Sequence, residues 1–217
     1  MENYEPLQIL YGDEMDILTL KSKVKLGCTR CEKCCIYRGD IKINPLTACR
    51  ISKYLNIELN EFLESYTDRL ENSKLETVLK TTGELQECVL YDKKIKGCRI
   101  HAVKPMQCVM FPLVPENLKR DYFYNSNQCI FKDAKEITVN EWINGNNKLY
   151  SRNKKIYIEW IKFLEWIEPK LVNVSKEQIE EFYKILFKEY NLKKWNLKTQ
   201  MLNNMWKVEK LVKEKVK

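Results

Sequence analysis

The spacing of apolar residues divides the chain into a mixed N-terminal part and a helical C-terminal part. Beyond residue 136, apolar side chains recur at helical spacing around Trp160 and again around Phe182. The apolar face of a third and last predicted helix carries Trp195, Leu202, Met205, Trp206, Val212 and Val216. The C-terminal part is therefore expected to be helical.

Capping signals mark where several of these helices begin. Asn44 followed by Pro45 is typical of a helix start, and that helix is expected to end near Leu55. Capping boxes of the form S/T-x-x-E/Q begin at Thr138 and Ser175. These local signals predict one helix in the N-terminal part and two in the C-terminal part.

The remaining N-terminal pattern predicts short strands and irregular chain. Residues 17–26 alternate between apolar and polar side chains, and residues 76–92 are expected to form a hairpin that turns near Gly83. Residues 93–131 contain Gly and Pro at positions that prevent long helices. No internal repeat is evident. We predict a mostly α fold, with α+β as the alternative, divided into a cysteine-rich domain (1–135) and a helical region (136–217).

Nine cysteines change this picture, because they are confined to the first part of the chain. They stand at Cys28, Cys31, Cys34, Cys35, Cys49, Cys88, Cys98, Cys108 and Cys129. The first 20 residues lack a basic start and an apolar run, and no window is apolar enough to span a membrane. We therefore expect a cytoplasmic protein, in which thiols stay reduced and serve as metal ligands more often than as disulfides.

The first cluster has the spacing of a metal site. Cys28, Cys31, Cys34 and Cys35 form C-x2-C-x2-C-C, and a two-residue spacer lets both thiolates of a turn reach one ion. Zinc and iron–sulfur centres both use this spacing.

A second, more dispersed group can serve the same or another centre. It consists of Cys88, Cys98, Cys108 and Cys129. Spacing leaves open whether the two groups form one centre or two. Cys49 is expected to be a buried apolar side chain, and His101, the single histidine, is expected to pack or form hydrogen bonds instead of binding metal.

The order of these motifs resembles the CxxCxxCC, or YkgJ-type, cysteine-cluster family of zinc- or iron-chelating proteins. The resemblance runs from the first cluster through Asn60-Glu61-Phe62-Leu63 and Cys88 to the motif G-C-x-I-x-x-x-x-P-x-x-C-x-x-F-P, residues 97–112. It implies eight ligands: Cys28, Cys31, Cys34, Cys35, Cys88, Cys98, Cys108 and Cys129. The chain departs from the family in having His101 for Tyr, Lys104 for Arg and Val109 for Arg.

Three functions remain open from the sequence. The first is a metal-binding protein that holds zinc or an iron–sulfur cluster, such as a 4Fe–4S cluster, for metal handling or electron transfer. The second is an enzyme, because the cysteine pattern is similar to that of S-adenosylmethionine-dependent lysine N-methylases. The third is an adaptor that binds RNA or an acidic protein through residues 193–217, which carry eight Lys and two Glu of a chain with net charge +8. The alternative for this basic helix is a docked helix with its lysines in water.

Overall fold

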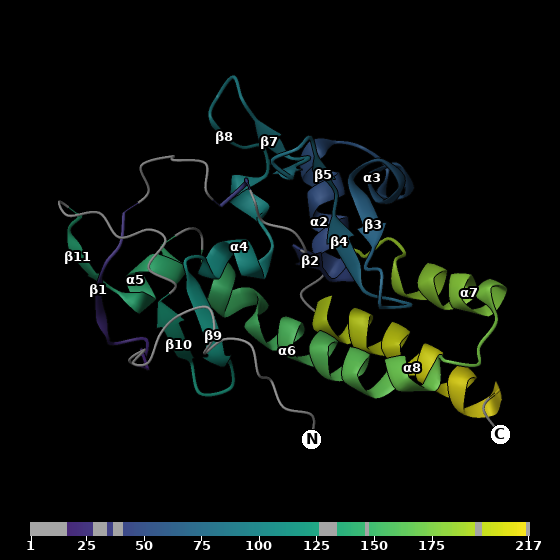
Figure 1. Ribbon diagram of the computed structural model, residues 1–217. Coiled ribbons are helices and arrows are strands. Elements are labelled where there is room, and N and C mark those ends of the chain that lie inside the picture. Colours follow the sequence, from purple (N-terminus) through teal and green to yellow (C-terminus); the bar gives the residue numbers. More distant parts are fainter. Residues whose placement is uncertain are drawn as a thin grey trace.

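The structure is a computed structural model that describes residues 17–27, 34–36, 41–125, 134–145, 148–193 and 197–215. Cys28, Cys31 and Cys129 lie outside these ranges, as do Trp195 and Val216 of the predicted last helix. Two long helices lie along one edge of the molecule, and the hairpin of residues 91–98, labelled β7 and β8, projects from the opposite side (Figure 1).

Helices supply most of the regular structure. They are α2 (Pro45–Leu55), α3 (Leu59–Tyr66), α4 (Met106–Met110), α5 (Val139–Asn144), α6 (Leu149–Ile167), α7 (Lys176–Leu186) and α8 (Leu197–Lys215), with the 3-10 turns η1 (His101–Val103) and η2 (Glu168–Lys170). Of the helices in the described ranges, none combines the length and the apolar character that a bilayer crossing demands.

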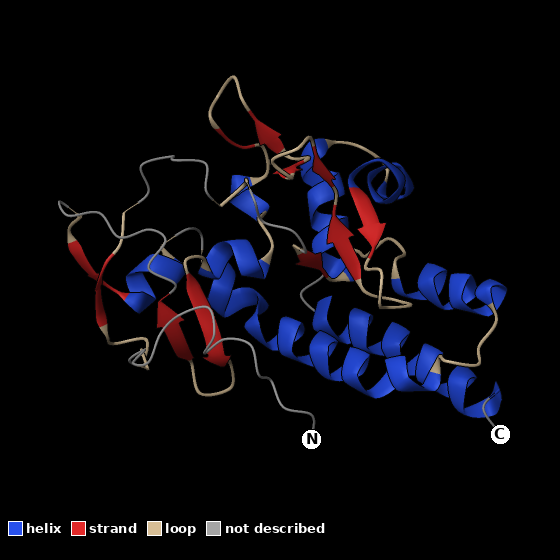
Figure 2. Ribbon diagram, in the orientation of Figure 1, coloured by secondary structure: helices blue, strands red, loops and turns tan. Residues whose placement is uncertain are grey.

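The strands are short and form several small antiparallel sheets (Figure 2). They are β1 (Lys23–Lys25), β2 (Lys42–Ile43), β3 (Thr67–Arg69), β4 (Thr77–Leu79), β5 (Thr81–Thr82), β6 (Glu87–Cys88), β7 (Tyr91–Asp92), β8 (Gly97–Cys98), β9 (Leu113–Asn117), β10 (Tyr122–Asn125) and β11 (Glu136–Thr138). The largest sheet has the order β2-β4-β3, and the others are the pairs β1-β11, β9-β10, β5-β6 and β7-β8.

Local sequence explains where the helices begin. The Asn44 side chain accepts a hydrogen bond from the backbone N–H of Thr47 at 2.8 Å, so it caps α2 as predicted. Both predicted capping boxes are present, at Thr138 for α5 and at Ser175 for α7. The three predicted starts are confirmed.

One apolar core joins segments from both parts of the chain. Its buried side chains come from α2 and α3, from the strands beside them and from α6, α7 and α8. A second core beside it packs β1, α4, β9 and β10 against α5 and the start of α6. The predicted division at residues 135 and 136 stays a prediction, and these cores show that side chains from both sides of it pack together.

The predicted fold class is only partly right. The helical C-terminal part is present, but helices account for 49% of the structure and strands for 19%, so the fold is mixed α+β. Trp206 corrects a second expectation, because its side chain is 61% exposed on α8 while Met205 and Val212 are buried. The strand expected over residues 17–26 is present as β1, with single bridge residues at Leu18, which pairs with Phe123, and at Leu26.

Candidate metal centre

The end of the first cysteine cluster lies beside Cys88. The carbonyl of Cys35 accepts a hydrogen bond of 2.7 Å from the backbone N–H of Cys88. The Sγ atoms of Cys34 and Cys35 are 3.9 Å apart, with Cys35 buried and Cys34 exposed. The tertiary structure therefore brings together two cysteine groups that are far apart in sequence.

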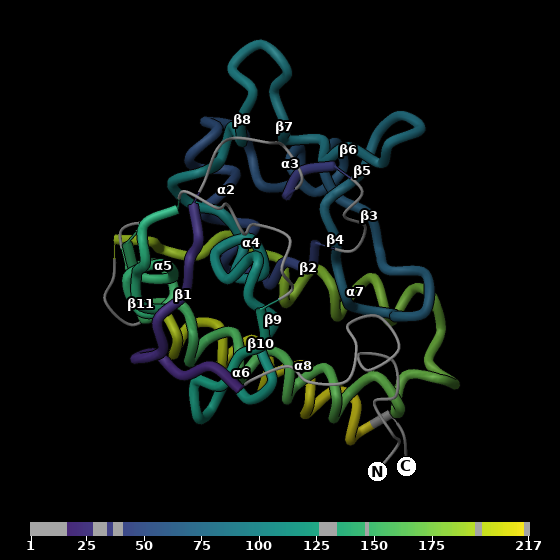
Figure 3. The backbone as a smooth tube through the Cα atoms, turned by 60° about the vertical axis from the view of Figure 1, so that its left-hand side comes forward, coloured from purple at the N-terminus to yellow at the C-terminus, as the bar shows by residue number. Residues whose placement is uncertain are grey.

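Cys88 and Cys98 occupy equivalent places in two successive hairpins. In the first hairpin, β5 and β6 pair Thr81 with Cys88, and in the second, β7 and β8 pair Tyr91 with Cys98. The residue after each cysteine closes the hairpin, since Val89 N–H donates to Lys80 O and Arg99 N–H donates to Leu90 O, both at 3.0 Å. Figure 3 shows the two hairpins extending outward at the same end of the molecule.

These hairpins are a tandem repeat of ten residues, 81–90 and 91–100, which have the same succession of strand and turn. Each has a left-handed residue two positions before its cysteine, Gln86 at φ 47° and Lys96 at φ 44°. Each has a buried aliphatic residue two positions after it, Leu90 and Ile100.

Sequence reasoning missed this repeat. The two hairpins share few residue types, but one signal was present: a cysteine with aliphatic residues three positions before it and two positions after it, repeated after ten residues.

Backbone hydrogen bonds point at both hairpin sulfurs. The Sγ of Cys88 accepts from the backbone N–H groups of Leu90 and Tyr91, and that of Cys98 accepts from Ile100. Burial nevertheless raises the pKa of Cys88, and it raises the pKa of Cys98 to about 11. Without a cation, both sulfurs are thus held as neutral thiols.

The thiols of Cys34, Cys35, Cys88 and Cys98 influence one another's ionisation. The pKa of Cys35 is raised far above its usual range. The largest cause is the hydrogen bond with Cys34, followed by burial and by the charges of Cys34, Cys98 and Cys88. The charge of Cys34 also raises the pKa values of Cys88 and Cys98. Ionising these thiols without a nearby cation is unfavourable, whereas a bound metal cation favours their thiolate forms.

The other candidate ligands are placed in part. Cys108 lies on α4, half-buried against the same core as Cys88 and Cys98. Nearby, the Gln107 side chain accepts a 2.6 Å hydrogen bond from Lys42 N–H, which ties α4 to β2. Within the described ranges, no three Cys, His, Asp or Glu side chains lie close enough together to hold a metal ion. His101 is exposed at the start of η1.

Cys49 lies within the apolar core and contacts the backbone of Tyr190. Its side chain is fully buried at 0% exposure, on α2. The Sγ atom donates to the carbonyl of Tyr190 at 3.7 Å and accepts from the backbone N–H of the same residue at 3.4 Å. This position suits the buried apolar role predicted for it.

We expect Cys49 to resist alkylation in the folded protein. Burial raises the pKa of the Cys49 thiol above that of the unfolded chain. The stability gained from keeping it neutral is complete below the unfolded pKa, about 8.5, and is lost as pH rises through the folded pKa. At pH 8, modification by iodoacetamide, followed by mass spectrometry, should be at least roughly tenfold slower in buffer than in urea. Equal rates would contradict the buried placement.

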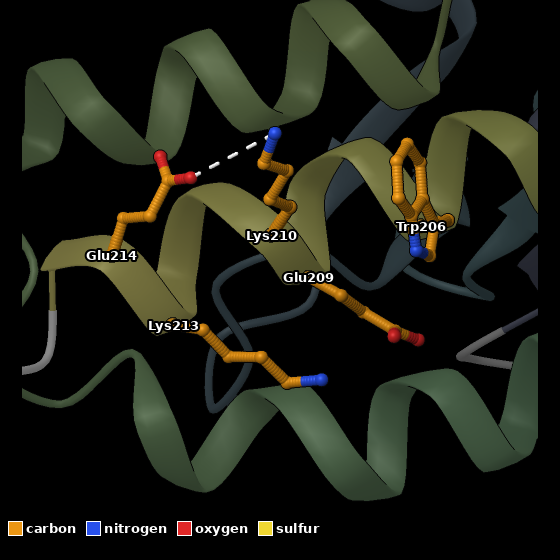
Figure 4. A pocket seen from close by; sticks show the side chains of 5 residues that line it. All are labelled: Trp206, Glu209, Lys210, Lys213 and Glu214. Carbon is orange, nitrogen blue, oxygen red and sulfur yellow. Dashed lines mark ion pairs between the residues drawn. The ribbon is translucent and has the colours of Figure 1, made fainter.

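The described part of the basic C-terminal helix, α8, carries five lysines and two glutamates, and two of these lysines lie near glutamates. Lys198 lies 3.7 Å from Glu159 of α6, and Lys210 lies 4.0 Å from Glu214. A shallow surface pocket is lined by Trp206, Glu209, Lys210, Lys213 and Glu214 (Figure 4). Two lysines and two glutamates make this pocket neutral, so the pocket itself gives no support for an RNA or acidic partner.

The cysteine pattern of the sequence agrees with a known family. Residues 27–138 match the CxxCxxCC family, described as "Putative zinc- or iron-chelating domain". The chain belongs to this family. The match covers more than half of the chain and includes all the predicted ligands. The metal associated with the family is zinc or iron.

A relative among curated proteins is uncharacterized. An uncharacterized protein of Methanocaldococcus jannaschii is 32% identical over 89 residues, which are 39% of this chain and 43% of that protein. The chain thus matches less than half of that relative's length. No solved structure matches the chain.

Proposed function

We propose that this protein binds zinc or iron, the latter as an iron–sulfur cluster, through Cys28, Cys31, Cys34, Cys35, Cys88, Cys98, Cys108 and Cys129. The observation that carries the proposal is that Cys35 lies against Cys88, with a backbone hydrogen bond of 2.7 Å, and that the charges of Cys34, Cys88 and Cys98 act on the Cys35 thiol. Soft sulfur donors suit both metals. Membership of a chelating family points the same way.

The hairpin backbone supports this function. Amide N–H groups that point at sulfur stabilise a thiolate and leave it oriented for a metal, as protein groups around metal ligands generally do. The proposed compartment is the reducing cytosol, where thiols serve as metal ligands more often than as disulfides. In that compartment, the centre would serve metal handling or electron transfer.

Anaerobic purification with elemental analysis and an absorption spectrum tests the proposal. An iron–sulfur protein is expected to be brown, with a broad band from sulfide-to-iron charge transfer and iron matched by acid-labile sulfide. A zinc protein is expected to be colourless, with about one or two zinc ions per chain. Protein that contains neither metal, and that takes up neither under reducing conditions, would refute the proposal.

A further inference from the structure

The tips of the two cysteine hairpins expose apolar side chains at matching positions. Leu85 is 42% exposed and Ile95 is 57% exposed, and both stand three residues before the hairpin's cysteine. Turn residues are usually small or polar, so two aliphatic residues at equivalent tips are unexpected. Both tips project from the body of the molecule, where another surface can reach them (Figures 1 and 3).

The two tips carry opposite charges. Glu84 and Glu87 belong to the first hairpin, whereas Lys93, Lys94 and Lys96 belong to the second. Within the chain, Glu87 already pairs with Lys93, with Oε2 and Nζ 2.9 Å apart.

The other charged side chains at the two tips are not neutralised by ion pairs between described residues. The side chains of Glu84, Lys94 and Lys96 are exposed, and none of them forms an ion pair with another described residue. The first tip therefore presents a negative charge beside Leu85, and the second presents positive charges beside Ile95.

We propose that the hairpin tips bind a second copy of this chain in a two-fold arrangement. A two-fold interface needs a surface that is complementary to itself. Here the two tips have the same backbone conformation and opposite charges, so the first tip of one copy is complementary in charge to the second tip of the other. Leu85 packs against Ile95 of the partner subunit, and Glu84 lies near Lys94 of the partner subunit. Both contacts occur twice.

The dimer should be weak and sensitive to salt. Two hairpin tips bury less than the roughly 800 Å² per partner of a standard stable interface, so the dissociation constant is expected to be on the order of 10–100 μM. Exposed ion pairs are screened over about 10 Å at 0.1 M salt, so association should weaken as salt increases. The dimer would also bring together the hairpins that carry Cys88 and Cys98 in both copies.

Sedimentation velocity of the full, metal-loaded chain from about 5 to 500 μM tests this interface. Wild-type protein should dimerise, and Glu84→Lys or Lys94→Glu alone should weaken association at least about fivefold. The two substitutions together should restore the wild-type constant within about twofold, because the charges are exchanged. Glu71→Lys, the same change at an exposed residue outside both hairpins, should have no effect.

Three results would overturn the proposal. They are a monomer at every concentration, a dimer that neither single substitution weakens, and a dimer that the paired substitutions fail to restore. Flotation of a monomeric protein with phosphatidylserine vesicles, lost in Ile95→Ser, would assign the tips to a membrane surface instead. Metal content and circular dichroism of each variant separate loss of the interface from loss of the metal centre.

Discussion

Replacing Cys98 with serine is expected to weaken metal binding roughly 100- to 1,000-fold, because one of the proposed thiolate donors is lost from a centre with a total binding free energy of about 10–16 kcal/mol. Cys98 lies among Cys34, Cys35 and Cys88, and its sulfur accepts a hydrogen bond from the Ile100 backbone. A serine hydroxyl is a poor ligand for zinc or iron at neutral pH. Competition with a chelator and metal analysis of the purified variant measure the loss.

Cys88→Ser is expected to have an effect of similar size. Cys88 and Cys98 hold the same position in the two hairpins, and backbone N–H groups donate to both sulfurs. Cys49→Ala is the matched control, since Cys49 lies in the core and contacts the Tyr190 backbone. Unchanged metal affinity in both serine variants, or loss of metal in Cys49→Ala, would contradict the proposed ligand set. Circular dichroism of the helices shows whether a variant has lost its fold instead.

Phe182→Ala is expected to lower the free energy of unfolding by about 3–5 kcal/mol, the usual cost of emptying a buried aromatic site. Phe182 lies on α7, is completely buried, and belongs to the core that also contains side chains of α2, α3, α6 and α8. Urea unfolding followed by circular dichroism and by tryptophan fluorescence measures the change, because Trp160 is buried in the same core.

Val172→Ala is the control for this substitution. Val172 is 73% exposed, so its truncation should change stability by less than about 0.5 kcal/mol. Because α2, α3 and the C-terminal helices share one core, both probes should report a single transition. A Phe182→Ala protein as stable as wild type would contradict this packing. Two separate transitions would instead identify residues 1–135 and 136–217 as independently folding units.

Features that depend on neighbouring residues could be predicted from the sequence. The caps at Asn44, Thr138 and Ser175 form within three residues of their partners, so their signals are local. Of the hairpin predicted over residues 76–92, the part around Gly83 is present as β5 and β6, whereas β4 pairs with β2 and β3. The second hairpin was not predicted, because Lys93 stands where the first hairpin has Gly83, so its turn, residues 93–96, contains no glycine.

The amino-acid sequence was sufficient to indicate a sulfur-rich metal centre and a helical C-terminal part, since residue type and short-range spacing encode ligand chemistry and helix faces. It did not show which sulfurs meet. That depends on long-range pairing, such as the Cys35–Cys88 hydrogen bond and the antiparallel pairing of β1 with β11. Such contacts arise when the whole chain buries its apolar surface, and no local pattern records them.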